Sequence, residues 1–265
     1  MIKLKENQGI PRHILLMMSI MAGLTVANLY YNQPLLELIR ADIGTTEVEA
    51  NLITVISQTG YALGLCFIIP MGDLYSRRRI IAVTLTTAAV MSLIIATSGS
   101  LSLIWGASLL MGMCSVIPQL FIPIAGQYSR PENKSRNIGY VLSGLLTGIL
   151  ASRVISGFIG EQLGWRAMFF ISAALMVVCL VVSVSMMPAM KPNFSGTYPQ
   201  LMHTVWRIVR TRPRIRINAV RSGLAFGSML AIWSCLAFHL AGEPFNAGAT
   251  MTGVLGLCGM AGAIA

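Results

Sequence analysis

The sequence predicts an all-α membrane protein that crosses the bilayer several times. Of its 265 residues, 55% are hydrophobic and only 11% are charged, whereas an ordinary soluble domain is about a quarter charged. The apolar residues gather in blocks of about 20, the length that one helix needs to span a bilayer. The basic residues fall between alternate blocks. These three features exclude a disordered chain, a coiled coil and a disulfide scaffold.

Eight apolar blocks are long enough to be spans. They cover approximately residues 14–36, 50–71, 80–98, 101–127, 138–160, 167–188, 217–241 and 247–265. The first block is too long for a signal peptide and lacks a small-residue cleavage site, so we expect it to remain as an anchor. The longest polar stretch, 189–216, divides the chain after six spans. Its apolar residues and arginines fall on opposite faces of a short amphipathic helix.

The basic residues are concentrated on one side of the membrane. The chain has 19 Lys and Arg against 9 Asp and Glu. All but Arg40, Arg153 and Arg166 lie before the first span or in the regions that follow the second, fourth and sixth spans. By the positive-inside rule these segments and the N-terminus are cytoplasmic. The charge therefore indicates membrane orientation. No aromatic stacking platform accompanies the arginines, so we expect no nucleic-acid partner.

Arg153 is the strongest functional signal because it lies near the middle of the fifth span. A charge at that depth costs about 2.5–3.5 kcal/mol on insertion scales and usually faces a cavity or a partner. No Asp or Glu lies well inside any predicted span, so neither a counter-ion nor a buried proton carrier is evident. An arginine that snorkels outward or pairs with a structural carboxylate is the alternative. We expect a functional arginine that faces a cavity.

Further polar side chains in the spans are candidates for one central substrate-binding site. They are Asn28, Tyr31 and Asn32 in span one, Gln58 in span two and Gln119 in span four. Amides are costly in hydrocarbon unless they are partnered or wet. Each alone is more typical of a hydrogen bond between helices. Taken together with Arg153, they predict a cavity lined by aromatics and amides. Pro118 and Pro123 are expected to kink span four.

The sequence contains no motif for a catalytic or metal site. A Gly-rich phosphate loop, a nucleophile–base pair and a Cys/His cluster are all missing from it. The five cysteines lie in apolar blocks without metal-ligand spacing, which is typical of small buried hydrophobic side chains. We therefore expect no enzyme activity, no catalytic residue, no metal and no cofactor.

The turn between spans two and three resembles the signature loop of the major facilitator superfamily, G-x-x-x-D-R-x-G-R-R. It matches at Asp73, Arg77 and Arg78 and departs at the other three motif positions. The resemblance implies that these three residues form half of an inner gate. A carboxylate at a helix end that faces guanidinium groups can lock two helices together. A plain positive-inside turn would explain the arginines but not Asp73.

The segment from Gly144 to Arg166 looks like the fifth span of drug-efflux members of that family. The family's Gly-Pro pair is replaced here by Ser152 or Arg153, and Ser108 stands where the efflux branch often has an arginine. Small residues at every fourth position of this span let another helix approach closely, either as a structural contact or as a sliding surface.

Members of the family usually have twelve spans in two repeated halves of six. Residues 63–66 recur as 255–258, where a repeat would place them. The resemblance thus implies a complete N-terminal six-helix half over 1–188, a cytoplasmic linker over 189–216 and the truncated start of a second half over 217–265. We expect spans nine to twelve to be missing and the 265-residue chain alone to be inactive.

The implied function is efflux of a small organic solute across a bacterial inner membrane by alternating access. The lipid bilayer and the solute are the expected partners, and protons are a candidate coupling ion. A non-transporting membrane scaffold or regulatory bundle is the alternative. Replacing Arg153 separates the two, because only a transporter loses flux without a loss of membrane insertion.

Overall fold

The computed structural model describes residues 6–188 and 194–245, together with residues 4, 190, 248, 250–251 and 254–255. Within these residues the chain is helical and contains no strand. The α-helices are α1 (Arg12–Val26), α2 (Leu36–Ile43), α3 (Glu47–Leu74), α4 (Arg77–Thr97), α5 (Leu101–Cys114), α6 (Ile117–Tyr128), α7 (Lys134–Leu163), α8 (Trp165–Met186), α9 (Tyr198–Thr211) and α10 (Pro213–Ala241). Three 3-10 turns accompany them: η1 (Ala27–Leu29), η2 (Gln33–Leu35) and η3 (Pro131–Asn133).

Six segments of the described chain are long and apolar enough to cross a membrane. They are Arg12–Ile43, Glu47–Leu74, Arg77–Thr97, Leu101–Tyr128, Pro131–Leu163 and Trp165–Met186. These segments match the first six predicted spans, and the all-α membrane bundle is confirmed. The predicted seventh span lies within α10. Most of the predicted eighth span, 247–265, lies outside the described residues, as do three of the four residues of the 255–258 repeat.

The first span is longer than the sequence predicted, and it is interrupted. The prediction ended at residue 36, but α1 ends at Val26, η1 and η2 follow, and α2 continues to Ile43. Gly44 then stops α2 at a φ of 72°, a conformation that glycine adopts without steric cost. Thr46 begins α3 with a capping box, in which its hydroxyl accepts from the backbone N–H of Glu49.

The fourth span is also divided, at one of the two predicted positions: before Pro118 and not at Pro123. Helix α5 ends at Cys114, and α6 begins at Ile117 with Pro118 in its first turn. Proline is tolerated there because the N–H groups of a first helical turn have no partner within the helix. The break therefore lies just before Pro118, while Pro123 lies within α6.

Two helix pairs approach closely through glycine. A Cβ added at Gly23 of α1 would lie 2.6 Å from the carbonyl oxygen of Gly144 on α7, closer than van der Waals contact allows. Gly148 likewise faces Gly23, and Gly60 of α3 meets the backbone of α5 at Leu109. The row of small residues on the fifth span is thus a packing surface for α1. This close contact brings the side chains of α7 against the first span.

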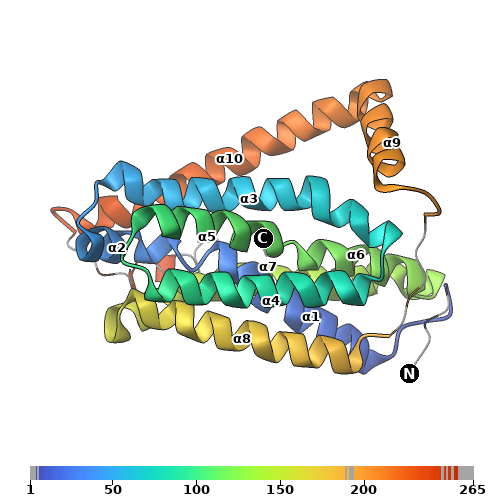
Figure 1. Cartoon of the computed structure of the whole chain (residues 1–265), viewed down its shortest axis with the longest axis horizontal. Coiled ribbons are helices and arrows are strands. Elements are labelled where there is room, and N and C mark those ends of the chain that lie inside the picture. Colours follow the sequence, from blue (N-terminus) through green and yellow to red (C-terminus); the bar gives the residue numbers. More distant parts are fainter. Residues whose placement is uncertain are drawn as a thin grey trace.

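Figure 1 shows the spans lying side by side, with α10 running across one face from α9 toward α2. The N-terminus and α9 lie at one end of the bundle, and α2 lies at the other. Inside the six-span body α4 packs on α8, α3 on α5 and α1 on α7. Helix α10 contacts α2, α3 and η2, but most of its described side chains are exposed.

Candidate functional site

Arg153 lies in the interior of the bundle, against the interrupted part of the first span. Its exposed fraction is 3%. The guanidinium Nε donates a hydrogen bond of 2.9 Å to Oε1 of Gln33, and its carbon lies 5.1 Å from the centroid of the Tyr30 ring. Both of these partners are neutral, so the charge is stabilised by an amide oxygen and by the negative face of a phenol ring. Arg153 is placed inside the protein rather than toward lipid.

The interruption of the first span brings Gln33 and Tyr30 to Arg153. The backbone N–H of Tyr30 donates to the carbonyl oxygen of Ala27, and that of Gln33 donates to the carbonyl oxygen of Tyr30. Both hydrogen bonds join residues i and i+3, as in a 3-10 helix. Such turns place residues i and i+3 above one another, so Tyr30 and Gln33 face α7 together. Pro34 follows in the first turn of η2, where its missing N–H costs nothing. The local sequence thus replaces a regular helix with a polar turn at the level of Arg153.

The same turn buries polar atoms that make no hydrogen bond to another described protein group. They are Oδ1 and Nδ2 of Asn32 and Nε2 of Gln33. Asn32 is 1% exposed and Gln33 is 2% exposed. A buried polar group without a partner costs about 1–3 kcal/mol, so such groups are rare and need a water, an ion or a ligand to explain them. Donors and an acceptor without a described protein partner are therefore present in the turn that contains Gln33.

A second polar pair joins α6 to α3 near this turn. Nε2 of Gln119 donates a hydrogen bond of 3.1 Å to the phenol oxygen of Tyr61. Tyr61 packs against the apolar cluster that contains Tyr30. Gln58 lies one turn before Tyr61, and its buried Nε2 makes no hydrogen bond within the described chain. Gln119 is thus joined to Tyr61, which packs against the cluster that contains Tyr30.

Asn28 and Tyr31 lie elsewhere. Oδ1 of Asn28 accepts a 2.7 Å hydrogen bond from Ser172, and its Nδ2 donates to the sulfur of Met176 at 3.2 Å. Asn28 thus fastens the first span to α8, the role that a lone amide in a span more often has. Tyr31 is buried in a different apolar cluster from Tyr30, together with Leu35 and neighbouring residues. The contacts found for these two side chains are with residues other than Arg153.

Three contacting residues are absent from the set that the sequence predicted: Tyr30, Gln33 and Tyr61. The sequence held one signal for the first two, because the polar run Asn28–Pro34 contains both of them. Helical periodicity could not select them, since the run is not a regular helix.

At the end of the bundle near the N-terminus, the predicted gate residues divide into two contacts. Oδ1 of Asp73, which is half-exposed, lies 3.5 Å from the guanidinium of buried Arg77. Arg77 also donates to Oε1 of Gln127 at 3.2 Å, which links the turn between α3 and α4 to α6. Arg78 instead donates to the carbonyl oxygen of Val184 on α8. Asp73 and Arg77 are brought together, and Arg78 fastens α4 to a different helix.

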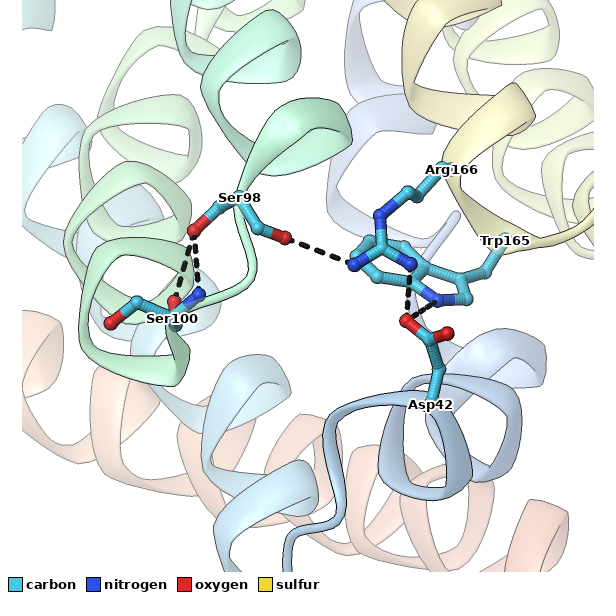
Figure 2. Close-up of polar contacts among 5 residues, drawn as sticks. All are labelled: Asp42, Ser98, Ser100, Trp165 and Arg166. Atoms are coloured by element: carbon cyan, nitrogen blue, oxygen red, sulfur yellow. Dashed lines mark hydrogen bonds and ion pairs between the residues drawn. The ribbon is translucent and has the colours of Figure 1, made fainter.

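A polar cluster at the opposite end was not predicted from the sequence. Figure 2 shows Asp42 of α2 accepting hydrogen bonds from both Trp165 and Arg166 at the start of α8. The Arg166 guanidinium also donates to the carbonyl oxygen of Ser98 at 3.1 Å and stacks 4.3 Å from the Trp165 ring centroid. The cluster joins α2, the turn between α4 and α5, and the turn between α7 and α8. Its residues are distant in sequence, so no local pattern revealed it.

Apolar spans that enclose a charged, amide-rich centre define a class: polytopic membrane proteins with functional groups buried between their helices. Comparison of the sequence with known protein families identifies the family within that class. The protein-family model described as Major Facilitator Superfamily matches residues 16–265 of the sequence. The chain belongs to the major facilitator superfamily.

Two relatives and one solved structure show the extent of the likeness. The chain is 35% identical over 253 residues to the uncharacterized transporter YgaY of Escherichia coli O157:H7, covering 96% of this chain and 64% of that protein. It is 31% identical to the probable transporter SCO4007 of Streptomyces coelicolor, covering 96% and 59%. A bacterial homolog of the human lysosomal transporter Spinster, inward-facing and occupied, has the same fold, with a TM-score of 0.71 at 15% identity over 91% of this chain and 56% of that one. The chain thus spans less than two thirds of the length of these proteins.

Proposed function

We propose that this protein is a secondary active transporter that moves a small organic solute across a bacterial inner membrane by alternating access. Family membership and the relatives named as transporters support the proposal. The direction, efflux, rests on the likeness of the segment from Gly144 to Arg166 to drug-efflux members. The distribution of Lys and Arg supports a cytoplasmic N-terminus.

The Arg153 centre is the observation that carries this proposal. Arg153 offers charged donors, and Asn32 offers a donor and an acceptor that no described protein group uses. A solute with an oxygen acceptor would be held by Arg153 and oriented by Asn32, Gln33, Gln58 and Gln119, with Tyr30 and Tyr61 forming the wall between them. Asn28 and Tyr31 are assigned to holding the interrupted turn in place. Buried polar groups at mid-span are where transporters of this architecture bind solutes.

Asp73 and Arg77 are assigned to the inner gate. Their contact is 3.5 Å long, and Asp73 is half-exposed although Arg77 is buried, so the carboxylate can exchange this contact for water. That property suits a contact that must open and close in each transport cycle. Arg78 keeps α4 on α8 while the gate moves. Protons remain a candidate coupling ion, which an imposed pH gradient across the vesicle membrane would test.

The experiment compares efflux from cells that produce the complete gene product with efflux from cells that lack it. Cells are loaded with a panel of radiolabelled organic acids, sugars and cationic dyes. At least one solute should leave faster when the protein is present. Arg153→Gln should lower that rate at least tenfold, because one charged hydrogen bond contributes about 1.5–3 kcal/mol. Arg153→Lys should retain part of the rate.

The matched control is Arg79→Gln, which removes an exposed charge on α4 and should leave efflux unchanged. The amount of each variant in the membrane is measured by immunoblotting. Full efflux by Arg153→Gln would contradict the assigned site. If the protein inserts but no solute of the panel moves, the non-transporting scaffold is favoured instead.

A further inference from the structure

A cavity of about 740 Å³ lies between the first turns of α1 and α7, apart from the Arg153 centre. Its lining residues are Arg12, Leu15, Leu16 and Ser19 of α1; Arg136, Asn137 and Tyr140 of α7; and residues 8–11, Arg130 and Asn133 of the adjoining loops. The hydroxyl of Ser19 donates a 2.6 Å hydrogen bond to the carbonyl oxygen of Tyr140. Beyond that bond, α1 and α7 close on each other at Gly23 and Gly144. The cavity is therefore a pocket with a floor and a mouth.

The mouth of this pocket is positively charged. Arg12, Arg130 and Arg136 line it, all three are exposed, and no carboxylate is among the lining residues. Arg130 is fixed by a 3.1 Å hydrogen bond from its Nε to the carbonyl oxygen of Gln8. Both α1 and α7 begin here, so both helix dipoles present their positive ends to the mouth. The nearest acid in sequence, Glu132, is exposed and lies outside the lining. The site thus favours an anion.

Part of the pocket lining is apolar, and an exposed apolar surface continues from it along α1. Leu15 and Leu16 line the pocket. Leu16 is 61% exposed, Ile20 one turn further along α1 is 54% exposed, and Tyr140 is 51% exposed. A free inorganic anion would contact the arginines and leave this apolar surface bare. A ligand with an anionic head and an apolar tail satisfies both parts of the surface.

We propose that this pocket binds the phosphate headgroup of an anionic phospholipid, with an acyl chain lying along Leu16 and Ile20. The pocket lies at the end of the bundle that contains the N-terminus and α9 (Figure 1). The lipid therefore comes from the leaflet on that side, which the Lys and Arg distribution predicts to be the cytoplasmic one. The inference does not depend on the transported solute or on the direction of transport.

The test is lipid binding by the purified full chain in detergent, measured by native mass spectrometry and by thermal unfolding. Phosphatidylglycerol, phosphatidylcholine and inorganic phosphate are titrated separately. Phosphatidylglycerol should bind about tenfold or more tightly than phosphatidylcholine, and Arg12→Gln/Arg136→Gln should lose about tenfold or more of that affinity. The charge-matched control is Arg79→Gln/Arg214→Gln, which changes two exposed arginines outside the pocket and should keep the affinity.

Three results would overturn the proposal. Equal binding of the two lipids would show that the pocket does not require an anionic headgroup. An equal loss of affinity in the control would show that net charge, and not the pocket, attracts the lipid. Stabilisation by inorganic phosphate as strong as that by phosphatidylglycerol would assign the pocket to a free anion. Arg12→Lys/Arg136→Lys keeps the charge and should retain most of the affinity, which separates loss of binding from loss of folding.

Discussion

Two arginines of the same helical hairpin, α7 and α8, have opposite environments. Arg166 is partly exposed, and its guanidinium meets a carboxylate, a carbonyl oxygen and an indole ring at the end of the bundle. Arg153 is buried at mid-span, and its described partners are the amide of Gln33 and the ring of Tyr30. A charge that serves only to hold loops is neutralised by a fixed carboxylate. At Arg153 the two contacts described are with an amide and a phenol ring, neither of which carries a charge.

The free-energy cost of placing the charge also differs between Arg166 and Arg153. Arg166 remains in contact with water, so its ion pair with Asp42 adds little and costs little. Arg153 is buried, and insertion scales put the free-energy cost of a charge at mid-span at about 2.5–3.5 kcal/mol. Selection for stability alone would not maintain that cost. The two arginines thus differ in their partners as well as in their depth: Arg166 meets a carboxylate at the end of the bundle, and Arg153 meets an amide and a ring in the interior.

Giving Arg153 a carboxylate partner should have the largest effect on function. In Gln33→Glu the guanidinium would form an ion pair like that of Arg166, and the solute would have to compete with it. We expect the half-saturating solute concentration to rise about tenfold or more, equivalent to about 1.4 kcal/mol, with folding retained. Efflux at increasing internal solute concentration measures this. Gln33→Asn adds no charge and is the control. An unchanged half-saturation in Gln33→Glu would contradict the comparison.

Disturbing the close approach of α1 and α7 should have the next largest effect, because that approach brings Gln33 to Arg153. Gly148→Ala would force a methyl group against Gly23, and such overpacking costs about 1–3 kcal/mol. We expect a lower thermal midpoint in detergent together with reduced transport. Gly99→Ala, beside the Arg166 cluster, meets only open space and should leave both unchanged. Equal effects of the two substitutions would show that helix approach is not the cause.

Removing the carboxylate from the Arg166 cluster should have the smallest effect. Asp42→Asn loses an exposed ion pair, so we expect a loss of up to about 1 kcal/mol in the free energy of unfolding and unchanged transport. Glu37→Gln breaks an ion pair within α2 alone and should change stability less than Asp42→Asn does. Thermal unfolding of the two variants side by side measures the difference. A transport defect in Asp42→Asn, with normal amounts in the membrane, would assign this end of the bundle a role beyond holding loops.

The sequence was sufficient for the first six spans and for the interior position of Arg153, since both follow from the free energy of transfer into a bilayer, which each residue contributes locally. It was insufficient for the residues around Arg153. Gln33 and Tyr30 reach it because the first span breaks into 3-10 turns, and a break removes the periodicity from which a face is read. Asn28 contacts α8 through Ser172, a pairing between distant segments that no pattern within either one indicates.

We propose that the polar turn beside Arg153 is a solute site that is reached alternately from both sides of the membrane. Chemical labelling of Asn32→Cys tests this most directly, in the complete protein with its native cysteines replaced by serine. A membrane-impermeant maleimide is applied to right-side-out and to inverted vesicles, with Ser100→Cys, in an exposed turn, as the control for one-sided access. We expect slow labelling of Asn32→Cys from both sides, and slower labelling when the transported solute is present. Labelling from one side only, or labelling that the solute does not affect, would contradict it.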